Sequence, residues 1–357
     1  MPDFPSASES STTVANRSIA TATWLQRHED KIWWLHSGYA LLLGVGIMWL
    51  GARNYNYLRV TLFHVGFIWL SSLFLPKFLN RPRLSERWAE RLRLFVNYFN
   101  KNFYQQVLFF ILPIYYASAT LSSANILFVA LLGISAILST LDVIYDRHLS
   151  VRRSLTASFF AFNLFALINV MLPVLWSVSN AWTTRFAAVM AALGFVSLYH
   201  PFPRWIRLRF VCGLLAAILF LVIVELGRAY IPPAPLRLVK ADFGTGIDRE
   251  SRQVNPVVVE TDPASTRELY VLTAIKAPMG LEERVRHRWY KSGKLIWASP
   301  LFDVVGGREE GYRLWTQYEF ATIESEARVR VDVETEGGQL IGRAVIGSVK
   351  APRSRSS

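Results

Sequence analysis

The sequence contains one cysteine, Cys212, among its 357 residues. A single thiol cannot form an intrachain disulfide, and it has no neighbour at the spacing of a metal site. The chain also lacks the HExxH, GxSxG, CxxC and Walker-loop patterns, which argues against the hydrolases, thiol oxidoreductases and nucleotide-binding proteins that depend on them. We therefore expect no cofactor and no metal. The sequence favours a non-enzymatic protein while leaving an enzymatic activity open.

Acidic residues are scarce relative to basic ones, and the formal net charge is +13. An excess of this size can indicate nucleic-acid binding. However, the residues from Arg228 onward are nearly balanced, with 20 basic and 17 acidic side chains. The remaining excess lies between apolar segments, where membrane orientation explains it. We therefore expect a lipid bilayer as partner and no nucleic acid.

Seven long apolar segments occupy the first two-thirds of the chain. Each is close to the ~20 residues that an α-helix needs to cross ~30 Å of hydrocarbon. A backbone without water must close its hydrogen bonds internally, which favours helices. The sequence predicts a membrane all-α bundle of seven transmembrane helices, at roughly 32–52, 56–76, 104–121, 123–142, 155–176, 181–200 and 209–227.

The basic residues fall on alternate connections between these segments, and this bias places the N-terminus in the cytoplasm. An odd number of crossings then puts everything after Arg228 outside. The expected domains are a disordered cytoplasmic tail at 1–31, the helical domain at 32–228, a proline-rich linker at 229–236, an exported domain at 237–350 and a disordered tail at 351–357. The linker should hold the exported domain off the bilayer.

The connection at 81–101 has apolar residues at helical spacing with arginines among them, as expected of an amphipathic helix lying in the membrane interface. Anchoring to the membrane surface, docking of a cytoplasmic partner and a lipid headgroup site are alternative roles. The residues that define this helix are Arg83, Arg87, Trp88, Arg91 and Arg93.

Three polar residues are expected deep within the helices: His64, Asn163 and Asn169. Polar groups at that depth are costly, so they have a structural or functional reason. They indicate either hydrogen bonds between helices or a ligand or proton site.

After the prolines, the apolar period changes from 3.6 to 2. Glycine pairs at Gly306-Gly307 and Gly337-Gly338 indicate hairpins. Short strands in about 120 residues indicate an all-β sandwich of immunoglobulin-like type. The expected strands are 236–243, 256–260, 268–275, 283–290, 294–305, 312–320, 327–334 and 339–349.

Several motifs of this region, taken in order, resemble the bacterial domain of unknown function 2914 over about 110 residues. They are Lys240-Ala-Asp-Phe-Gly-Thr-Gly-Ile-Asp-Arg-Glu250, Arg286-His-Arg-Trp-Tyr-Lys-Ser-Gly-Lys294, Tyr312-Arg-Leu-Trp-Thr316, Val331-Asp-Val333 and Gly338-Gln-Leu-Ile-Gly-Arg343. The helical part resembles domain of unknown function 5924, found in uncharacterised proteobacterial proteins that carry this module. The resemblance implies an architecture, a membrane bundle followed by an exported β-sandwich, but no activity. We expect the bundle in the bacterial inner membrane and the C-terminal domain in the periplasm.

Strand alternation assigns faces within the exported domain. His287 falls on the core side with Val285 and Trp289, so we interpret it as a satisfied core histidine rather than a ligand or base. Arginines fall on the other side, and neighbouring strands would gather them into a face for phosphate or carboxylate groups. The alternative is a solvated face balanced by glutamates. The candidate residues are Arg284, Arg286, Arg288, Arg313, Arg328 and Arg330.

Three classes of function remain open at this level. The first is a non-enzymatic scaffold, sensor or accessory protein of the cell envelope, whose sandwich binds an anionic glycan, a lipid or an envelope protein. The second is a transporter or lipid-handling protein with a path between the helices. The third is a membrane enzyme, which is disfavoured because no catalytic cluster is evident.

Overall fold

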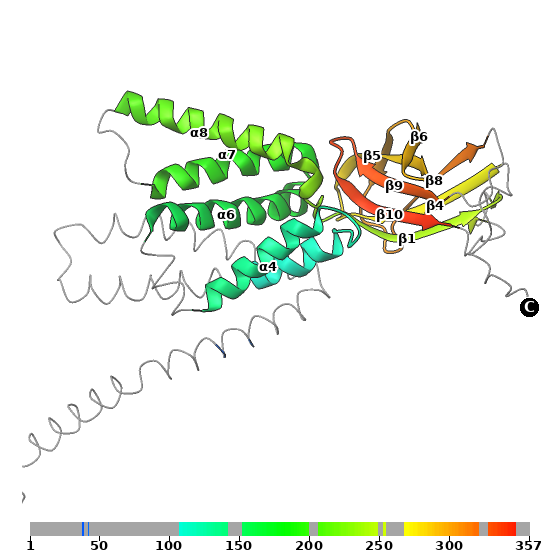
Figure 1. Ribbon diagram of the computed structural model, residues 1–357, viewed down its shortest axis with the longest axis horizontal. Helices are drawn as coiled ribbons and strands as arrows, with labels where there is room; N and C mark the ends of the chain where they lie inside the picture. The colour runs from blue at the N-terminus through cyan, green and yellow to red at the C-terminus, as the bar shows by residue number, and fades with distance from the viewer. Residues whose placement is uncertain are drawn as a thin grey trace, which may run out of the picture.

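The structure is a computed structural model that describes residues 107–141, 152–199, 206–248, 253–254, 268–320 and 328–347, together with Gly38 and Leu42. Helices occupy the first part of this range and strands the second, and the ends of the helices meet the β-sheet region (Figure 1). Both predicted tails, the interfacial helix at 81–101 and nearly all of the segments at 32–52 and 56–76 lie outside the described residues.

The described helices pack side by side, α6 against α7 and α7 against α8. Their shared core contains aromatic and aliphatic side chains together with a row of alanines on α7, which lets the helices approach closely. A 3-10 turn, η2, ends the helical part. The helices are Val107–Ala117, α4 (Ile126–Thr140), α6 (Arg153–Trp176), α7 (Asn180–Leu198) and α8 (Ile206–Leu226), followed by η2 (Arg228–Tyr230).

The expected seven-helix transmembrane bundle is wrong. Within the described residues, one helix, Ser154–Trp176, is long and apolar enough to cross a membrane. Shorter apolar helices stand at Val107–Ala117, Ile126–Thr140 and Phe210–Leu226. The 15 residues of α4 extend only about 22 Å at 1.5 Å per residue, which is less than ~30 Å of hydrocarbon. An apolar segment shows its composition but not where its helix begins and ends, and this is why α4 is shorter than the segment expected at 123–142.

The C-terminal β-sheet region is present as expected. It contains a three-stranded sheet in the order β1-β4-β8, a five-stranded sheet in the order β10-β9-β5-β6 with β7 also on β5, and the small pair β2-β3. The strands are β1 (Arg237–Gly244), β2 (Ile247–Asp248), β3 (Gln253–Val254), β4 (Glu268–Lys276), β5 (Glu282–Lys291), β6 (Lys294–Ala298), β7 (Phe302–Val305), β8 (Tyr312–Glu319), β9 (Val329–Thr335) and β10 (Leu340–Ile346).

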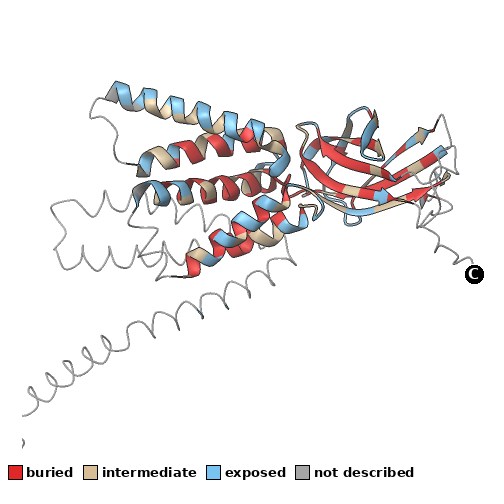
Figure 2. Cartoon of the chain, in the orientation of Figure 1, coloured by how far each residue is buried: buried red, intermediate tan, exposed pale blue. Residues whose placement is uncertain are grey.

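The two larger sheets bury their inner faces against each other, and we call this unit the sandwich (Figure 2). One core cluster lies toward the helices and includes Leu236, Ile275 and Val333. The other surrounds Trp289 and includes Val271. Each cluster combines side chains from both sheets, so neither sheet has a complete core without the other.

The single strand expected at 294–305 is two strands, β6 and β7. β6 pairs with the second half of β5, and β7 pairs with the first half. Pro300 lies between them and has no N–H to continue a ladder. Its neighbour Ser299 donates its backbone N–H to His287 O at 2.9 Å. The chain therefore bends at the proline and returns to the same partner strand.

The proline-rich connection, expected to be a linker that holds the exported domain away, is packed between the helices and the sandwich. All residues from Ile231 to Leu236 are buried. Ile231 and Ala234 belong to the core of the helices, whereas Leu236 belongs to the core of the sandwich. The sandwich therefore lies directly against the ends of the helices.

Candidate functional site

His287 lies in the sandwich core and is fully buried. Trp289 Nε1 donates to Thr316 Oγ1 at 3.0 Å, and Thr316 Oγ1 lies 2.8 Å from His287 Nδ1. His287 Nε2 lies 2.9 Å from Thr273 Oγ1, which donates to Leu314 O at 3.2 Å. These contacts form one directed chain if the ring carries its proton on Nε2. Burial lowers the pKa of His287 to about 3. The arrangement agrees with a satisfied core histidine.

Arginines of three neighbouring strands share the outer side of the five-stranded sheet. Arg286 lies opposite Glu334, and Arg288 lies opposite Asp332. Across the next pair, Arg343 also lies opposite Asp332. Residues directly opposite in an antiparallel pair project to the same side. We call the set Arg286, Arg288, Arg330 and Arg343 the basic face.

Two buried carboxylates hold this basic face in place. Asp332 accepts two hydrogen bonds from Arg343, at 2.7 and 3.0 Å. Glu334 lies 3.3 Å from Arg288 and 3.9 Å from Arg286. Burial raises the pKa of Glu334 despite these guanidinium groups. Four cations therefore surround two acids, and the basic face keeps an excess of positive charge.

Tyr290 lies between two of these arginines. The guanidinium of Arg330 stands 4.0 Å from the centre of the ring, and that of Arg288 stands 5.7 Å from it. Such cation–π contacts fix the direction of the guanidinium groups without neutralising them. The basic face is therefore ordered before any ligand binds.

The structure does not bring all six predicted arginines together. Arg284 lies near the beginning of β5 and pairs with Glu336 at 2.5 Å. Arg313 lies on β8, in the other sheet, and pairs with Glu310 at 2.6 Å. Arg328 is exposed and directly precedes β9. The basic face thus combines three of the predicted residues with Arg343, which was not among the predicted ones.

A network of hydrogen bonds joins the helices to the sandwich. The backbone N–H of Asn180, the first residue of α7, donates to Glu283 Oε2 at 2.6 Å, and its side chain donates to Gln339 Oε1 at 2.9 Å. Asn125 Nδ2 donates to Leu340 O at 3.2 Å. Burial raises the pKa of Glu283, and the positive end of the helix favours its ionised form.

Beside this network lies a cleft of about 780 Å³ between the helices and the sandwich. Glu225 bridges two arginines on its helical wall, at 2.8 Å from Arg185 and 2.8 Å from Arg228. The sandwich contributes acidic and basic side chains to the opposite wall. The lining residues are Ser179, Ala181, Trp182, Arg185, Arg228, Glu282, Glu283, Arg284, Asp303, Val305, Glu336 and Gly337. Sequence reasoning missed this cleft because its two walls are about 100 positions apart in the chain.

The three polar residues that were expected deep within the helices have different surroundings. Asn169 donates to Tyr115 Oη at 3.1 Å, and Thr184 Oγ1 lies 3.0 Å from Asn169 Oδ1. This is the hydrogen bonding between helices that the sequence suggested. Asn163 is buried, but its amide makes no hydrogen bond within the part of the chain that the structure describes. His64 and the residues Arg83, Arg87, Trp88, Arg91 and Arg93 lie outside the described residues.

The described part of the chain contains no cluster of side chains suited to a metal ion.

Comparison with known families gives two consecutive matches. Residues 13–271 match a family of unknown function, DUF5924. Residues 282–345 match a protein family of unknown function, DUF2914. No curated protein matches the chain.

The boundary between the two matches falls inside the sandwich. The first match includes β1 and ends within β4, whereas the second begins at β5 and includes β8. Because β4 pairs with both β1 and β8, the two matched regions build one sandwich together.

Proposed function

The chain belongs to the family of unknown function DUF5924, and from that premise we propose that it is a membrane-anchored protein of the cell envelope. Its sandwich binds an anionic component, either a glycan, a lipid or an acidic surface of a partner protein, on the basic face. The role is that of a scaffold, sensor or accessory protein. Proteins of this type need an ordered binding surface and no catalytic cluster.

The observation that supports this proposal is the imbalance of charge on the basic face. Its arginines outnumber their acidic partners, and Arg286 has only a 3.9 Å contact with a carboxylate that Arg288 shares. The side chains of Arg286, Arg288 and Arg330 remain about one-third exposed. Guanidinium groups with this geometry favour phosphate and carboxylate ligands, which accept paired hydrogen bonds.

Anchoring in a membrane is supported by the outer surface of the helices. Much of α8 is exposed (Figure 2), and a long row of its exposed residues is apolar, a kind of surface that usually marks a membrane or protein contact. This row consists of Phe210, Leu214, Leu215, Ile218, Leu219, Val222, Ile223 and Leu226, each roughly half exposed or more. Lipid is a solvent in which such a surface has no cost.

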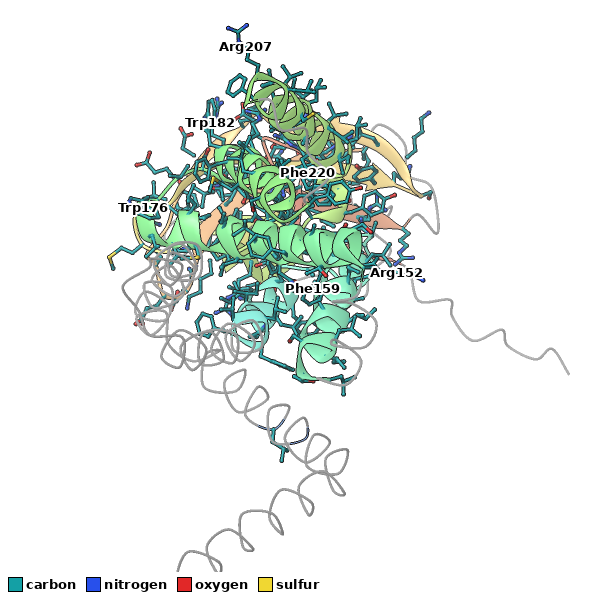
Figure 3. All side chains as sticks on the ribbon, turned by 90° about the vertical axis from the view of Figure 1, so that its left-hand side faces the viewer. Arg152, Phe159, Trp176, Trp182, Arg207 and Phe220 are labelled. Atoms are coloured by element: carbon teal, nitrogen blue, oxygen red, sulfur yellow. The ribbon has the colours of Figure 1, made fainter. Side chains whose placement is uncertain are left out.

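Exposed tryptophans lie at the end of the helices that meets the sandwich. Trp176 and Trp182 are 65% and 66% exposed and point outward (Figure 3). Tryptophan is enriched where hydrocarbon meets the polar headgroups. We therefore place the headgroup layer at this end, with the sandwich beyond it on the periplasmic side of the bacterial inner membrane.

This placement has a direct test. A reporter enzyme fused after Lys350 should behave as exported, whereas one fused in the connection near Arg87 should behave as cytoplasmic. Cytoplasmic activity of the first fusion would contradict the proposed location.

The binding role is tested with a double variant of the full chain, Arg286→Gln with Arg288→Gln. It should bind vesicles rich in phosphatidylglycerol, or anionic glycan from the envelope, at least about tenfold more weakly, since two charge-assisted hydrogen bonds are lost. The matched control is Lys240→Gln with Arg313→Gln, which removes two cations from the other sheet. Equal loss in both variants would show that only overall charge matters and would refute the basic face.

A further inference from the structure

The cleft between the helices and the sandwich differs in charge from one wall to the other. On the helical wall, Arg185 and Arg228 share the single carboxylate of Glu225, which leaves one positive charge in excess. On the sandwich wall, Glu282 and Asp303 make no ion pair within the described residues, and Arg284 is matched by Glu336. The cleft is therefore positive toward the helices and negative toward the sandwich.

A ligand for this cleft needs an anionic group and a cationic group side by side. A phosphate would accept hydrogen bonds from Arg185 and Arg228. A primary ammonium would donate to Glu282 and Asp303, which a quaternary ammonium cannot do because it has no N–H. A volume of about 780 Å³ lies within the range of small-molecule sites.

The position of the cleft also indicates which ligand group, the phosphate or the ammonium, lies nearer the helices. It lies beside Trp182, whose ring stands 5.6 Å from the guanidinium of Arg185, at the proposed level of the lipid headgroups. In a phospholipid, the phosphate is attached on the side of the acyl chains and the amine lies farther out. The wall that would bind phosphate is made by the helices, and the wall that would bind the amine is made by the sandwich.

We propose that this cleft binds the phosphoethanolamine headgroup of a membrane phospholipid, with Arg185 and Arg228 on the phosphate and Glu282 and Asp303 on the ammonium. This inference rests on the membrane anchoring proposed above, but not on ligand binding by the basic face. The cleft is a second site with a different ligand: the basic face binds an anionic group, whereas the cleft binds a headgroup that carries both a negative and a positive charge.

The test uses the full chain in detergent micelles with phosphatidylethanolamine, phosphatidylcholine and phosphatidylglycerol in equal amounts, and native mass spectrometry to count the bound lipids. We expect phosphatidylethanolamine to be retained about tenfold more than either of the others, the factor for one charge-assisted hydrogen bond. Equal retention of the three lipids would overturn the proposal. Competition by soluble glycerophosphoethanolamine, but not by glycerophosphoglycerol, should confirm that the headgroup carries the recognition.

Two variants test which wall of the cleft binds the phosphate and which binds the ammonium. Asp303→Asn should reduce the preference over phosphatidylglycerol, and Arg185→Gln should weaken retention of all three lipids, while Glu225 keeps Arg228 as its partner. The matched controls are Glu310→Gln and Arg313→Gln, members of an ion pair that does not line the cleft. Unchanged retention in both cleft variants, with unfolding midpoints equal to the parent, would also overturn the assignment.

The proposals for the basic face and for the cleft can be tested independently of each other. Arg286→Gln with Arg288→Gln should leave the preference for phosphatidylethanolamine intact while weakening the binding of anionic vesicles. A loss of that preference in this double variant would assign the zwitterion to the basic face and refute the cleft.

Discussion

Glu283 Oε2, on strand β5, accepts a 2.6 Å hydrogen bond from the backbone N–H of Asn180, the first residue of helix α7. A carboxylate from the sandwich thus caps a helix that lies about 100 residues earlier in the chain. The first N–H groups of a helix have no partner within the helix, and an acceptor there is stabilising. This contact makes the helix and the sandwich depend on each other.

Removing this cap should destabilise the whole protein. Glu283→Ala leaves a buried N–H without an acceptor, and we expect a loss of about 1–3 kcal/mol in the free energy of unfolding. Glu282→Ala, one residue earlier and exposed, should change it by less than about 0.5 kcal/mol. Thermal unfolding of the full chain measures both. Equal losses would show that Glu283 does not carry the contact.

The sandwich should lose stability in acid through His287. Its folded-state pKa of about 3 lies below the ~6.5 of an unfolded histidine. The unfolded chain therefore takes up a proton first, and this contribution is full above about pH 6.5 and falls as the pH drops toward 3. His287→Gln should be less stable than the parent at neutral pH, and the difference should shrink between pH 6.5 and 4. A constant difference would refute the titration.

The two buried asparagines of α6 should respond in opposite directions to the same substitution. Asn163→Leu removes an amide that has no hydrogen bond and should stabilise the helices by about 1–3 kcal/mol. Asn169→Leu leaves Tyr115 and Thr184 without their shared partner and should destabilise them by a similar amount. The unfolding midpoints of the two variants in one detergent decide this. A loss in Asn163→Leu would instead indicate a polar role at that position.

The β-sheet region should fold alone only when it is expressed across the boundary of the two family matches. Residues 236–350 contain all the described strands, so they should show a β-type circular dichroism spectrum and cooperative unfolding. Residues 282–345 lack β1 and β4, so β8 has no partner in its sheet and both cores lose one side. We expect this fragment to be unfolded. A folded spectrum for 282–345 would show that it is a separate module.

Several strands were predictable because their signal is local, whereas the strand expected at 294–305 is two strands and the one expected at 256–260 lies outside the described residues. Alternation along β5 places Val285, His287 and Trp289 inside, and the structure buries all three. Arg343 was not among the predicted residues because no faces were assigned to the last strand, although Ala344 and Ile346 are buried and the same alternation puts Arg343 on the outer side. Helix ends were less predictable: the segment expected at 123–142 is helical only over α4 (Ile126–Thr140), because apolar composition does not mark where a helix begins and ends.

The candidate site was predictable only in part, because only some of its residues follow a local pattern. Neighbouring arginines on β5 lie two positions apart, so their common side follows from the period of a strand. That β8 belongs to the other sheet follows from topology, and Arg313 was therefore misplaced. The cleft joins Arg185 to Asp303, and no local pattern relates residues that meet only when two units pack together.

The buried connection from Ile231 to Leu236 has a mechanical consequence. A flexible tether would let the sandwich swing freely and absorb any pull on it. Here the connection is packed, and further contacts at Asn125, Asn180 and Arg228 tie the sandwich to separate points on the helices. A force applied at the basic face then meets no flexible segment between the sandwich and the helices. It would reach the helices as a torque, so under the function proposed above the tilt of the helices would change with tension on the bound component.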